Sequence, residues 1–336
     1  MSAARVTALV LTYDGRELLE EILPSLAAQE FRPFRTIVVD NGSSDGTAAW
    51  VREARPGCEV LRLEENVGVA AALNRGLALV HTEYVALLNN DLELEAGWLG
   101  ALVAALDAHP RAASATGKML SFHERGVFDA AGDLLHWSGA ATHRGMGQPD
   151  MGQYDTPEAV FAPCAGAALY RRAAFDAVGP FDEAFFAYQE DVDWGLRAQL
   201  AGWTARYEPR AVAYHMGGAT TRRTWGYYNA LQRRNQVLVV LKDYPGRALA
   251  RHSVKIALYQ AGWVVASAKE GNLRRQLSAL GEVAVALPRV VRQRREVQAL
   301  RRVRIAYLDT VITPEPYAGQ SPLQRLRSIL GTLLSR

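Results

Sequence analysis

The chain has 336 residues, of which 49% are hydrophobic and 22% are charged, so a globular fold with a full core is expected. This length allows one large domain with an appendage, or two domains. The net charge of +3 is unevenly divided: residues 1–245 hold 22 Lys and Arg against 30 Asp and Glu, whereas residues 246–336 hold 16 against 5. A basic C-terminal quarter suits an anionic surface, either nucleic acid or lipid headgroups.

The cysteines and the N-terminus indicate the compartment. Cys58 and Cys164 are far apart, and the first apolar run, residues 5–11, leaves no room for a secretory leader before it. We therefore expect a cytosolic protein in a reducing compartment, with neither a disulfide framework nor a zinc site. The longest uncharged run of the basic quarter, residues 256–268, is shorter than the roughly 20 residues that cross a bilayer, so it could lie on a membrane but not span it.

The first hundred residues alternate strand-like and helix-like patterns. Four short apolar and β-branched runs read as strands, at residues 5–11, 35–40, 59–63 and 83–88. Between them, helical spacing appears around Leu18, Leu19, Ile22 and Leu26, and again around Val69, Ala72 and Leu73. This alternation predicts an α/β fold with a mostly parallel sheet, right-handed crossovers and helices on both faces.

Polar residues follow three of these strands, where ligands bind in such sheets. Thr12, Tyr13 and Asp14 follow the first strand, the second ends on Asp40, and the fourth ends in the segment Asn-Asn-Asp at residues 89–91. Parallel strands bring their carboxyl ends together, so we expect these groups to converge on one edge.

The later chain divides into four segments. Residues 111–185 are rich in Gly, Pro and aromatic residues and are left as irregular strands and loops. A short helix is expected to begin near Asp191, since Val192, Leu196 and Leu200 form a stripe, Asp193 can pair with Arg197 and Gly202 suits the C-cap. Residues 205–215 read as a strand that Pro209 interrupts and that ends on His215. Beyond residue 245 the chain is helical and basic, and Val290, Val297, Leu300 and Val303 share a face typical of an interfacial helix.

Residues 38–47, VVDNGSSDGT, permit two interpretations. One is a plain turn with Asp45 as a helix cap. The other is a ligand site, because Asp40 lies on the strand before the turn. No GxGxxG and no GxxxxGK[ST] motif occurs, so backbone cradling of phosphate is not indicated. A divalent cation held by an acid is the alternative way to neutralise a diphosphate, and Asp91 is the natural ligand.

Together these segments resemble family 2 glycosyltransferases with a GT-A fold, most closely the bacterial rhamnosyltransferase-like members. The resemblance covers about residues 4–245, and residues 246–336 would be a C-terminal α-helical basic extension. It departs from the family pattern in Asp14 and in the single carboxylate of residues 89–91. The matching segments are TYD (12–14), VVDNGSSDGT (38–47), ENVGVAAALNRG (65–76), LLNND (87–91), GPFDEAFFAYQEDVDWGLRAQLAGW (179–203) and AVAYH (211–215).

The resemblance implies a donor site for a nucleotide sugar. Asp40 would hold the nucleobase, Asn90 would face the ribose, and Asp91 would bind Mg²⁺ or Mn²⁺ with His215 as a further metal or phosphate ligand. Without the family, His215 is more simply a packing residue. The remaining donor-site residues would be Thr12, Tyr13, Asp14, Asn66, Gly68, Asn74 and Arg75.

The resemblance also implies a catalytic base and an acceptor pocket. Inverting transfer needs a carboxylate to take the acceptor proton, and Asp191 is the choice, with Glu190 beside it. The alternative role of these acids is to favour the helix N-terminus, whose dipole would also keep Asp191 ionised. Cys164, Ala165 and Gly166 match the segment that approaches sugar and acceptor, and Trp194 could stack on a sugar; structural packing is the alternative for all four.

The implied activity is inverting transfer of a sugar to a hydroxyl of a glycan or lipid-linked acceptor, with dTDP-rhamnose the expected donor and UDP-hexoses next. The basic region would hold the enzyme at the inner face of the cell membrane or mediate homodimerisation, and nucleic acid is not an expected partner. The sequence leaves two alternative functions. A nucleotidyltransferase or oxidoreductase is disfavoured by the missing phosphate loops. A catalytically silent membrane-bound scaffold is disfavoured by the presence of Asp91 and Asp191.

Overall fold

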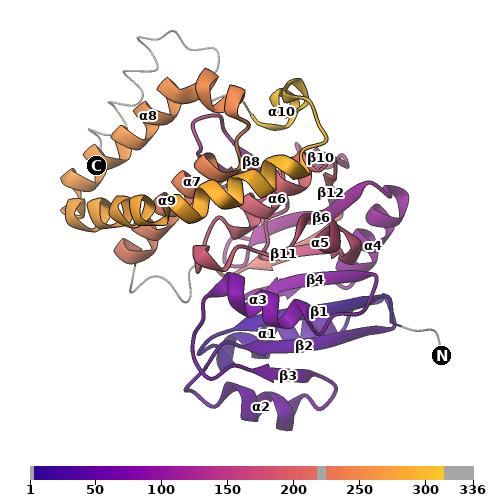
Figure 1. The fold of residues 1–336 in the computed structure, drawn as a ribbon. Helices are drawn as coiled ribbons and strands as arrows, with labels where there is room; N and C mark the ends of the chain where they lie inside the picture. Colours follow the sequence, from indigo (N-terminus) through magenta and orange to yellow (C-terminus); the bar gives the residue numbers. More distant parts are fainter. Residues whose placement is uncertain (1–3, 218–224, 314–336) are drawn as a thin grey trace.

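One mixed sheet organises the chain in this computed structural model, which describes residues 4–217 and 225–313 (Figure 1). Its strands are β1 (Val6–Thr12), β2 (Phe34–Asp40), β3 (Glu59–Arg62), β4 (Tyr84–Asn89), β5 (Leu92–Leu94), β6 (Ala112–Ser121), β7 (Phe128–Ala130), β10 (Glu158–Val160), β11 (Ala167–Arg171) and β12 (Thr204–His215). The main path runs β10-β12-β6-β11-β4-β1-β2-β3, with β5 beside β12 and β7 beside β6. A separate pair joins β8 (Asp133–Leu135) to β9 (Ala141–His143).

The N-terminal half has the predicted alternation, with β1 parallel to both β2 and β4, and β2 parallel to β3. Side chains of α1 and α4 pack on one face of the sheet, and those of α3, α5 and α6 on the other. Helices on both faces are therefore confirmed. The helices of this half are α1 (Arg16–Ala27), α2 (Thr47–Ala54), α3 (Val69–Leu77), α4 (Trp98–Ala108), α5 (Arg172–Val178) and α6 (Glu190–Leu200), with a 3₁₀ turn η1 (Glu183–Phe185).

The middle of the chain completes the sheet in a way that the sequence left unassigned. β11 inserts antiparallel between β4 and β6, and β12 runs parallel to β6. The register of β12 shifts between Glu208 and Val212, which confirms the interruption expected at Pro209. Because proline cannot donate to a ladder, it is accommodated at such an irregularity.

Helix α6 lies between two hydrophobic clusters. Val192, Leu196 and Leu200 form the predicted stripe and face the C-terminal helices, whereas Trp194 and Ala198 face the sheet. Gly202 follows the C-cap with φ 88°, where a left-handed residue is favoured. Packing on both sides of α6 therefore holds the helix, including its first turn, in place.

The C-terminal helices do not stand apart from the sheet. They are α7 (Trp225–Asp243), α8 (Gly246–Lys269), α9 (Leu273–Leu300) and α10 (Ile305–Val311). The predicted boundary near residue 245 falls in the turn between α7 and α8, but one hydrophobic cluster joins α6, α7 and α9 across it. Val290 and Val297 belong to that cluster, so the face predicted to be interfacial is buried against the protein; this prediction was wrong.

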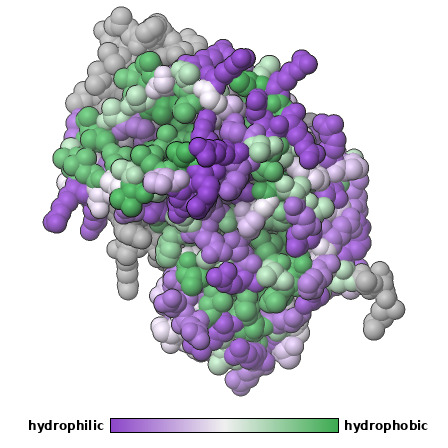
Figure 2. Space-filling view, in the orientation of Figure 1, coloured by the Kyte–Doolittle hydropathy of each residue, from purple (hydrophilic) through white to green (hydrophobic). Residues whose placement is uncertain are grey.

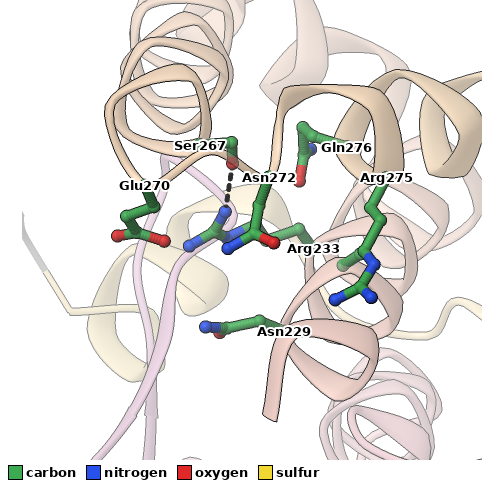
Figure 3. Close-up of a pocket in the computed structure, with 8 residues that line it drawn as sticks. Asn229, Arg233, Ser267, Glu270, Asn272, Arg275 and Gln276 are labelled. Atoms are coloured by element: carbon green, nitrogen blue, oxygen red, sulfur yellow. Dashed lines mark hydrogen bonds between the residues drawn. The ribbon is translucent and has the colours of Figure 1, made fainter. Parts of the chain in front are cut away.

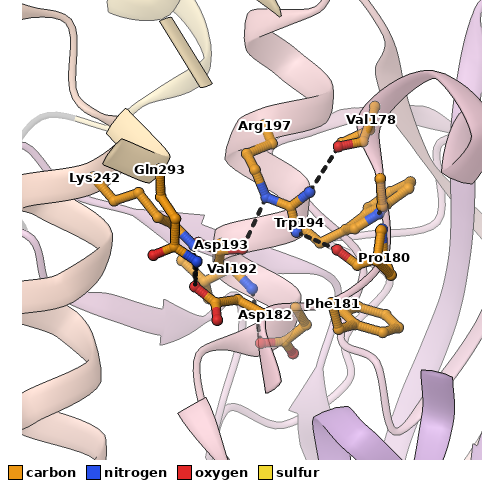
Figure 4. A network of polar contacts seen from close by, with 12 residues as sticks. Val178, Pro180, Phe181, Asp182, Val192, Asp193, Trp194, Arg197, Lys242 and Gln293 are labelled. Atoms are coloured by element: carbon orange, nitrogen blue, oxygen red, sulfur yellow. Dashed lines mark hydrogen bonds and ion pairs between the residues drawn. The ribbon is translucent and has the colours of Figure 1, made fainter. Parts of the chain in front are cut away.

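A buried polar network also joins α6 to the C-terminal helices (Figure 4). Lys242 pairs with Asp193 and, at 2.8 Å, with Asp182, and Gln293 donates to Asp182 at 3.0 Å. Asp193 also pairs with Arg197 at 2.9 Å, as predicted. Since all of these groups are largely buried, the network holds the helices in one arrangement.

The outer face of α8 and α9 combines apolar and cationic side chains, and Figure 2 shows apolar groups gathered over these helices beside hydrophilic ones. None of the helices in the described ranges is long and apolar enough to cross a membrane. The exposed apolar residues of α8 and α9 are Val254, Leu258, Val265, Leu273, Leu277, Val285, Leu287 and Val291.

Candidate active site

The polar strand ends converge as predicted. Thr12 pairs in register with Asp40, and Leu11 with Asn89, so the carboxyl ends of β1, β2 and β4 form one edge. The amide of Asn90 donates to the Thr12 hydroxyl at 2.9 Å. Both side chains are buried, so Thr12 and Asn90 form the floor between β1 and β4.

Asp40 presents a carboxylate oxygen without a hydrogen-bond partner among the described residues. Its Oδ1 accepts from the Ser43 amide at 2.9 Å, whereas Oδ2 has only the Arg62 guanidinium at 3.8 Å. The side chain is fully buried. A buried carboxylate oxygen without a hydrogen-bond donor is costly, and a ligand donor such as a nucleobase N–H would satisfy it.

The loops after β1 and β2 are tied together beside Asp40. Asp14 adopts φ 44°; its carboxylate accepts from the Ser44 amide at 2.7 Å and its own amide donates to the Ser43 hydroxyl at 2.9 Å. The ring of Tyr13 is 37% exposed at this edge. Asp45 precedes Gly46, the N-cap of α2, and its carboxylate accepts from the amide of Thr47, the first residue of that helix, at 3.0 Å.

Asn66 and Gly68 place the start of α3 against a second loop. Asn66 accepts from the Asn41 side chain and from the Gly68 amide, both at 3.0 Å. Gly68 has φ 87°, and an added Cβ would lie 2.6 Å from the Phe186 ring, so only glycine fits. The amide of Val69 donates to the Phe186 carbonyl, which links this donor-side segment to the loop before α6.

Asn74 and Arg75 contact the segment around η1. The side chain of Asn74 accepts from the Phe181 amide at 3.1 Å and donates to the Phe181 carbonyl at 2.9 Å. Arg75 lies 3.5 Å from Glu183. Both residues therefore have a structural role, and their contact with a nucleotide stays a prediction.

Asp91 and His215 meet where β4 and β12 end. Nε2 of His215 lies 3.3 Å from Oδ1 of Asp91, and its Nδ1 lies 2.8 Å from Oδ2 of Asp129. Burial lowers the pKa of His215, but hydrogen bonds to Asp129 and Asp91 outweigh it and raise that pKa to about 10. Asp129 was not found from the sequence, where it is one aspartate in an unassigned region.

This arrangement fits a divalent cation. In metal sites, the histidine nitrogen that does not bind the metal is commonly held by a carboxylate, as Asp129 holds Nδ1 here. A cation would displace the proton shared between Asp91 and His215, and its remaining oxygen ligands would come from diphosphate and water. Asp91 and His215 would be the two protein ligands.

Asp191 lies in the first turn of α6 and is partly exposed. Its Oδ2 accepts from the Ala165 amide at 3.4 Å and its Oδ1 from the Val192 amide at 2.8 Å. Burial, followed by the charge of Asp133, raises its pKa to about 6. The pKa lies above the ordinary aspartate value because desolvation outweighs the backbone hydrogen bonds that favour the ionised form.

The segment Cys164, Ala165 and Gly166 connects Asp191 to the strand edge. The Asn89 amide donates to the Gly166 carbonyl at 2.8 Å, one residue from the amide that contacts Asp191. Cys164 is buried, and Glu190 is buried with Oε2 unpartnered among the described residues. Burial and the neighbouring Asp191 raise the pKa of Glu190 to about 8.

Trp194 cannot line a sugar pocket as predicted. It is 1% exposed, packs against Tyr170, Phe175 and Phe181, and donates from Nε1 to the Gly179 carbonyl at 3.0 Å. The sequence could not distinguish the core-facing side of α6 from its open side at this position. Trp194 is therefore a core residue.

The loop before α6 is strained and firmly held. Phe186, Tyr188 and Gln189 all have positive φ, at 64°, 66° and 71°. Such conformations persist only when the surroundings enforce them. Asn235 of α7 does so by donating to three carbonyls of this loop, those of Phe185, Ala187 and Tyr188, at 2.8–2.9 Å. No local sequence pattern indicates this role for Asn235.

A small hollow among α7, α8 and α9 is a separate feature (Figure 3). Arg233 lies at its wall, 3.9 Å from the centroid of the Trp263 ring, and donates to the Ser267 hydroxyl. The cavity holds about 10 Å³, room for about one water, so it cannot admit a sugar or nucleotide. The sheet edge remains the candidate active site.

Comparisons with known proteins agree with this geometry. The profile of glycosyl transferase family 2 matches residues 7–179. The N-acetylglucosaminyl-diphospho-decaprenol L-rhamnosyltransferase of Mycobacterium tuberculosis strain H37Rv is 28% identical over 292 residues, covering 80% of this chain and 95% of that protein. Mannosyltransferase PcManGT from Pyrobaculum calidifontis, solved with GDP-Man and Mn²⁺, has a TM-score of 0.55 and 19% identity, covering 98% of this chain and 85% of the other. Staphylococcus aureus TarS with UDP has a TM-score of 0.56 and 20% identity, covering 88% and 87%.

The fold and the polar sheet edge define a nucleotide-sugar-dependent glycosyltransferase of GT-A architecture. The chain belongs to glycosyl transferase family 2. The family, fold class and enzyme class expected from the sequence are thus confirmed.

Proposed function

We propose that this enzyme transfers a sugar, with inversion at the anomeric carbon, from a nucleotide diphosphate to an acceptor hydroxyl. One observation carries the proposal: residues 164–166 bond to β4 through Asn89 and to α6 through Asp191. We infer that the Asp40 oxygen without a hydrogen-bond partner, the Asp91 and His215 pair and the partly exposed Asp191 belong to one site.

Asp191 is the base in this mechanism. Its carboxylate takes the proton of the acceptor hydroxyl while that oxygen attacks the anomeric carbon from the face opposite the nucleotide. The bond from that carbon to the phosphate oxygen breaks, and its electron pair leaves with the nucleotide diphosphate. A pKa of about 6 leaves Asp191 ionised at neutral pH yet more basic than an ordinary aspartate.

Asp40 would orient the nucleobase through its unpartnered oxygen, with Tyr13 and Asp14 along the same edge. Asn90 would face the ribose from beside Thr12. Asp91 and His215 would hold Mg²⁺ or Mn²⁺, which when bound neutralises charge on the diphosphate. Mn²⁺ accompanies GDP-Man in the structure of PcManGT, a neighbour in fold.

The proposed donor is dTDP-rhamnose, with UDP-hexoses as the alternative. The support is the similarity to the mycobacterial protein named as an L-rhamnosyltransferase. That protein's name also specifies a diphospho-decaprenol acceptor, so a lipid-linked glycan is the acceptor class proposed here. The cationic and apolar outer face of α8 and α9 would keep the enzyme at the cytoplasmic membrane surface, near such an acceptor.

A donor panel tests the function. Nucleotide release and sugar transfer are measured with dTDP-rhamnose, UDP-glucose, UDP-N-acetylglucosamine and GDP-mannose, each with Mn²⁺ or with EDTA. We expect turnover of dTDP-rhamnose that EDTA abolishes and Mn²⁺ restores. Turnover of a UDP-sugar alone would refute the donor assignment, and full turnover in EDTA would refute the metal. No turnover of any donor would refute the proposed activity.

A further inference from the structure

A second group of metal-binding residue types lies near Asp191. Asp133 opens β8 and pairs in register with His143, which ends β9. His143 Nδ1 lies 2.7 Å from Asp133 Oδ1. Cys164 completes the group, and one ligand atom from each of the three residues lies within 4.8 Å of the others.

Little positive charge faces the carboxylates near this group. Asp133 is buried, and among the described residues its one ion pair is with His143. The adjacent Asp191 has no Lys or Arg partner in those ranges, whereas the buried Asp193 two residues on has both Lys242 and Arg197. Buried carboxylates are normally paired or bind a metal, and a metal ion here would replace the His143 proton as the partner of Asp133.

We propose that Asp133, His143 and Cys164 form a site for a thiophilic divalent cation such as Zn²⁺. Thiolate sulfur, imidazole nitrogen and carboxylate oxygen are the ligands that zinc takes in proteins, and three of them leave a fourth position for water. The edge site with Asp91 and His215 has no sulfur and suits a harder ion.

Only small movements are needed for this site to close. Ligand atoms around a tetrahedral zinc lie roughly 3.3–3.8 Å apart given the usual bond lengths, so separations of up to 4.8 Å shorten by about 1 Å. His143 is half-buried, which gives an ion access from solvent. Burial raises the pKa of the Cys164 thiol, so the metal must displace the thiol proton, which passes to solvent.

This site lies beside a contact to α6, the helix that carries the proposed base. Cys164 directly precedes Ala165, whose amide contacts Asp191. A bound ion would hold this segment and the base together. This inference concerns metal binding alone and does not rest on the proposed donor or acceptor.

Cobalt spectroscopy tests the inference, because Co²⁺ occupies zinc sites and a thiolate ligand gives an intense near-ultraviolet charge-transfer band. The full chain, reduced and metal-free, is first saturated with Mn²⁺ to fill the edge site and then titrated with Co²⁺. The chain has two cysteines, so Cys58→Ser is a matched control for Cys164→Ser. We expect the band in the wild type and in Cys58→Ser, its complete loss in Cys164→Ser, and its weakening in His143→Gln.

Absence of the band in the wild type, or its survival in Cys164→Ser, would overturn the proposal. Far-ultraviolet circular dichroism confirms that each variant is folded. If Cys164→Ser does not fold, His143→Gln decides, since the ring is half-buried and its loss is less disruptive. An unchanged band and unchanged Co²⁺ affinity in that variant would contradict the site.

Discussion

Asp191 must be ionised to act as a base, yet its surroundings favour the protonated form more than water does. Burial and Asp133 raise its pKa to about 6 from an ordinary 3.8. Transfer should therefore be full above that value and fall about tenfold for each pH unit below it. We expect this acid limb in kcat, measured at saturating Mn²⁺ and donor. A limb near the ordinary aspartate pKa would show that the group is not held in the environment described.

Asp129 is expected to position the metal ligand His215. Asp129→Asn should weaken Mn²⁺ binding by about 10- to 100-fold, because the ring loses the carboxylate that orients Nδ1. Isothermal titration of Mn²⁺ in the presence of nucleoside diphosphate measures this. The control is Asp176→Asn, whose exposed carboxylate pairs with Arg172 and with no other side chain in the described ranges. Equal Mn²⁺ affinity in both variants would remove Asp129 from the site.

Individual site residues were predictable where their role is local. Asp40 ends a strand and Asp91 follows one, and the acids of α6 lie at the start of an apolar stripe. All of these positions can therefore be predicted from the sequence. Asp129 contacts His215 across 86 positions of sequence and Asn235 contacts the loop before α6 across 47–50, so no local pattern could reveal them. Trp194 was misplaced because α6 is buried on two sides, and periodicity shows only one.

At the scale of the element, α6 depends on a charge network rather than on a surface pair. The Lys242 side chain is 4% exposed and Asp193 is fully buried, so removal of the ammonium leaves a buried charge without that partner. Lys242→Met should lower the free energy of unfolding by about 3–5 kcal/mol. Urea denaturation at neutral pH measures the loss. A change within about 1 kcal/mol would mean that the network does not hold the helices.

Asp243 is the matched control for that substitution. Burial and the neighbouring Asp193 raise its pKa well above the usual range, which favours the protonated carboxyl, and that form can donate to Asp193. An asparagine can donate in the same way. Asp243→Asn should therefore change the free energy of unfolding by no more than about 1 kcal/mol. A loss as large as that of Lys242→Met would show that Asp243 is ionised.

Elements with a clear local pattern were predicted well, and those that depend on distant segments were not. Strands β1 to β4 and the helices α1 and α3 follow from hydrophobic period and turn residues. The insertion of β11 between β4 and β6 depends on pairing between distant segments, which short apolar runs do not encode. The apolar face of α9 was correctly recognised at Val290 and Val297, but its partner is the protein core and not a membrane.

At the scale of the whole molecule, the acidic sheet and the basic helices form one body with an electrostatic division. Val254 and Leu258 are 70% and 69% exposed on α8 and one helical turn apart. Replacing both by serine should weaken binding to anionic vesicles at least about tenfold, since their burial in lipid contributes roughly 1.5–3 kcal/mol each. Vesicle sedimentation at two salt concentrations measures this, with weaker binding expected at high salt.

Met151→Ser is the control for the vesicle experiment, because this residue is 86% exposed on a loop of the sheet-bearing part. It should bind vesicles as the wild type does. Equal binding by the wild type and the double serine variant would show that this face of α8 does not contact lipid. A concentration-dependent dimer that the double variant lacks, seen by analytical ultracentrifugation, would instead assign the face to self-association.

The most direct test of the central claim compares sugar transfer by the wild type and Asp191→Asn. The base-catalysed account predicts that kcat falls by about 10²- to 10⁴-fold, while the affinity for nucleoside diphosphate and Mn²⁺ stays within about threefold. That split separates loss of the base from loss of the donor site. Full transfer activity in Asp191→Asn would contradict the account.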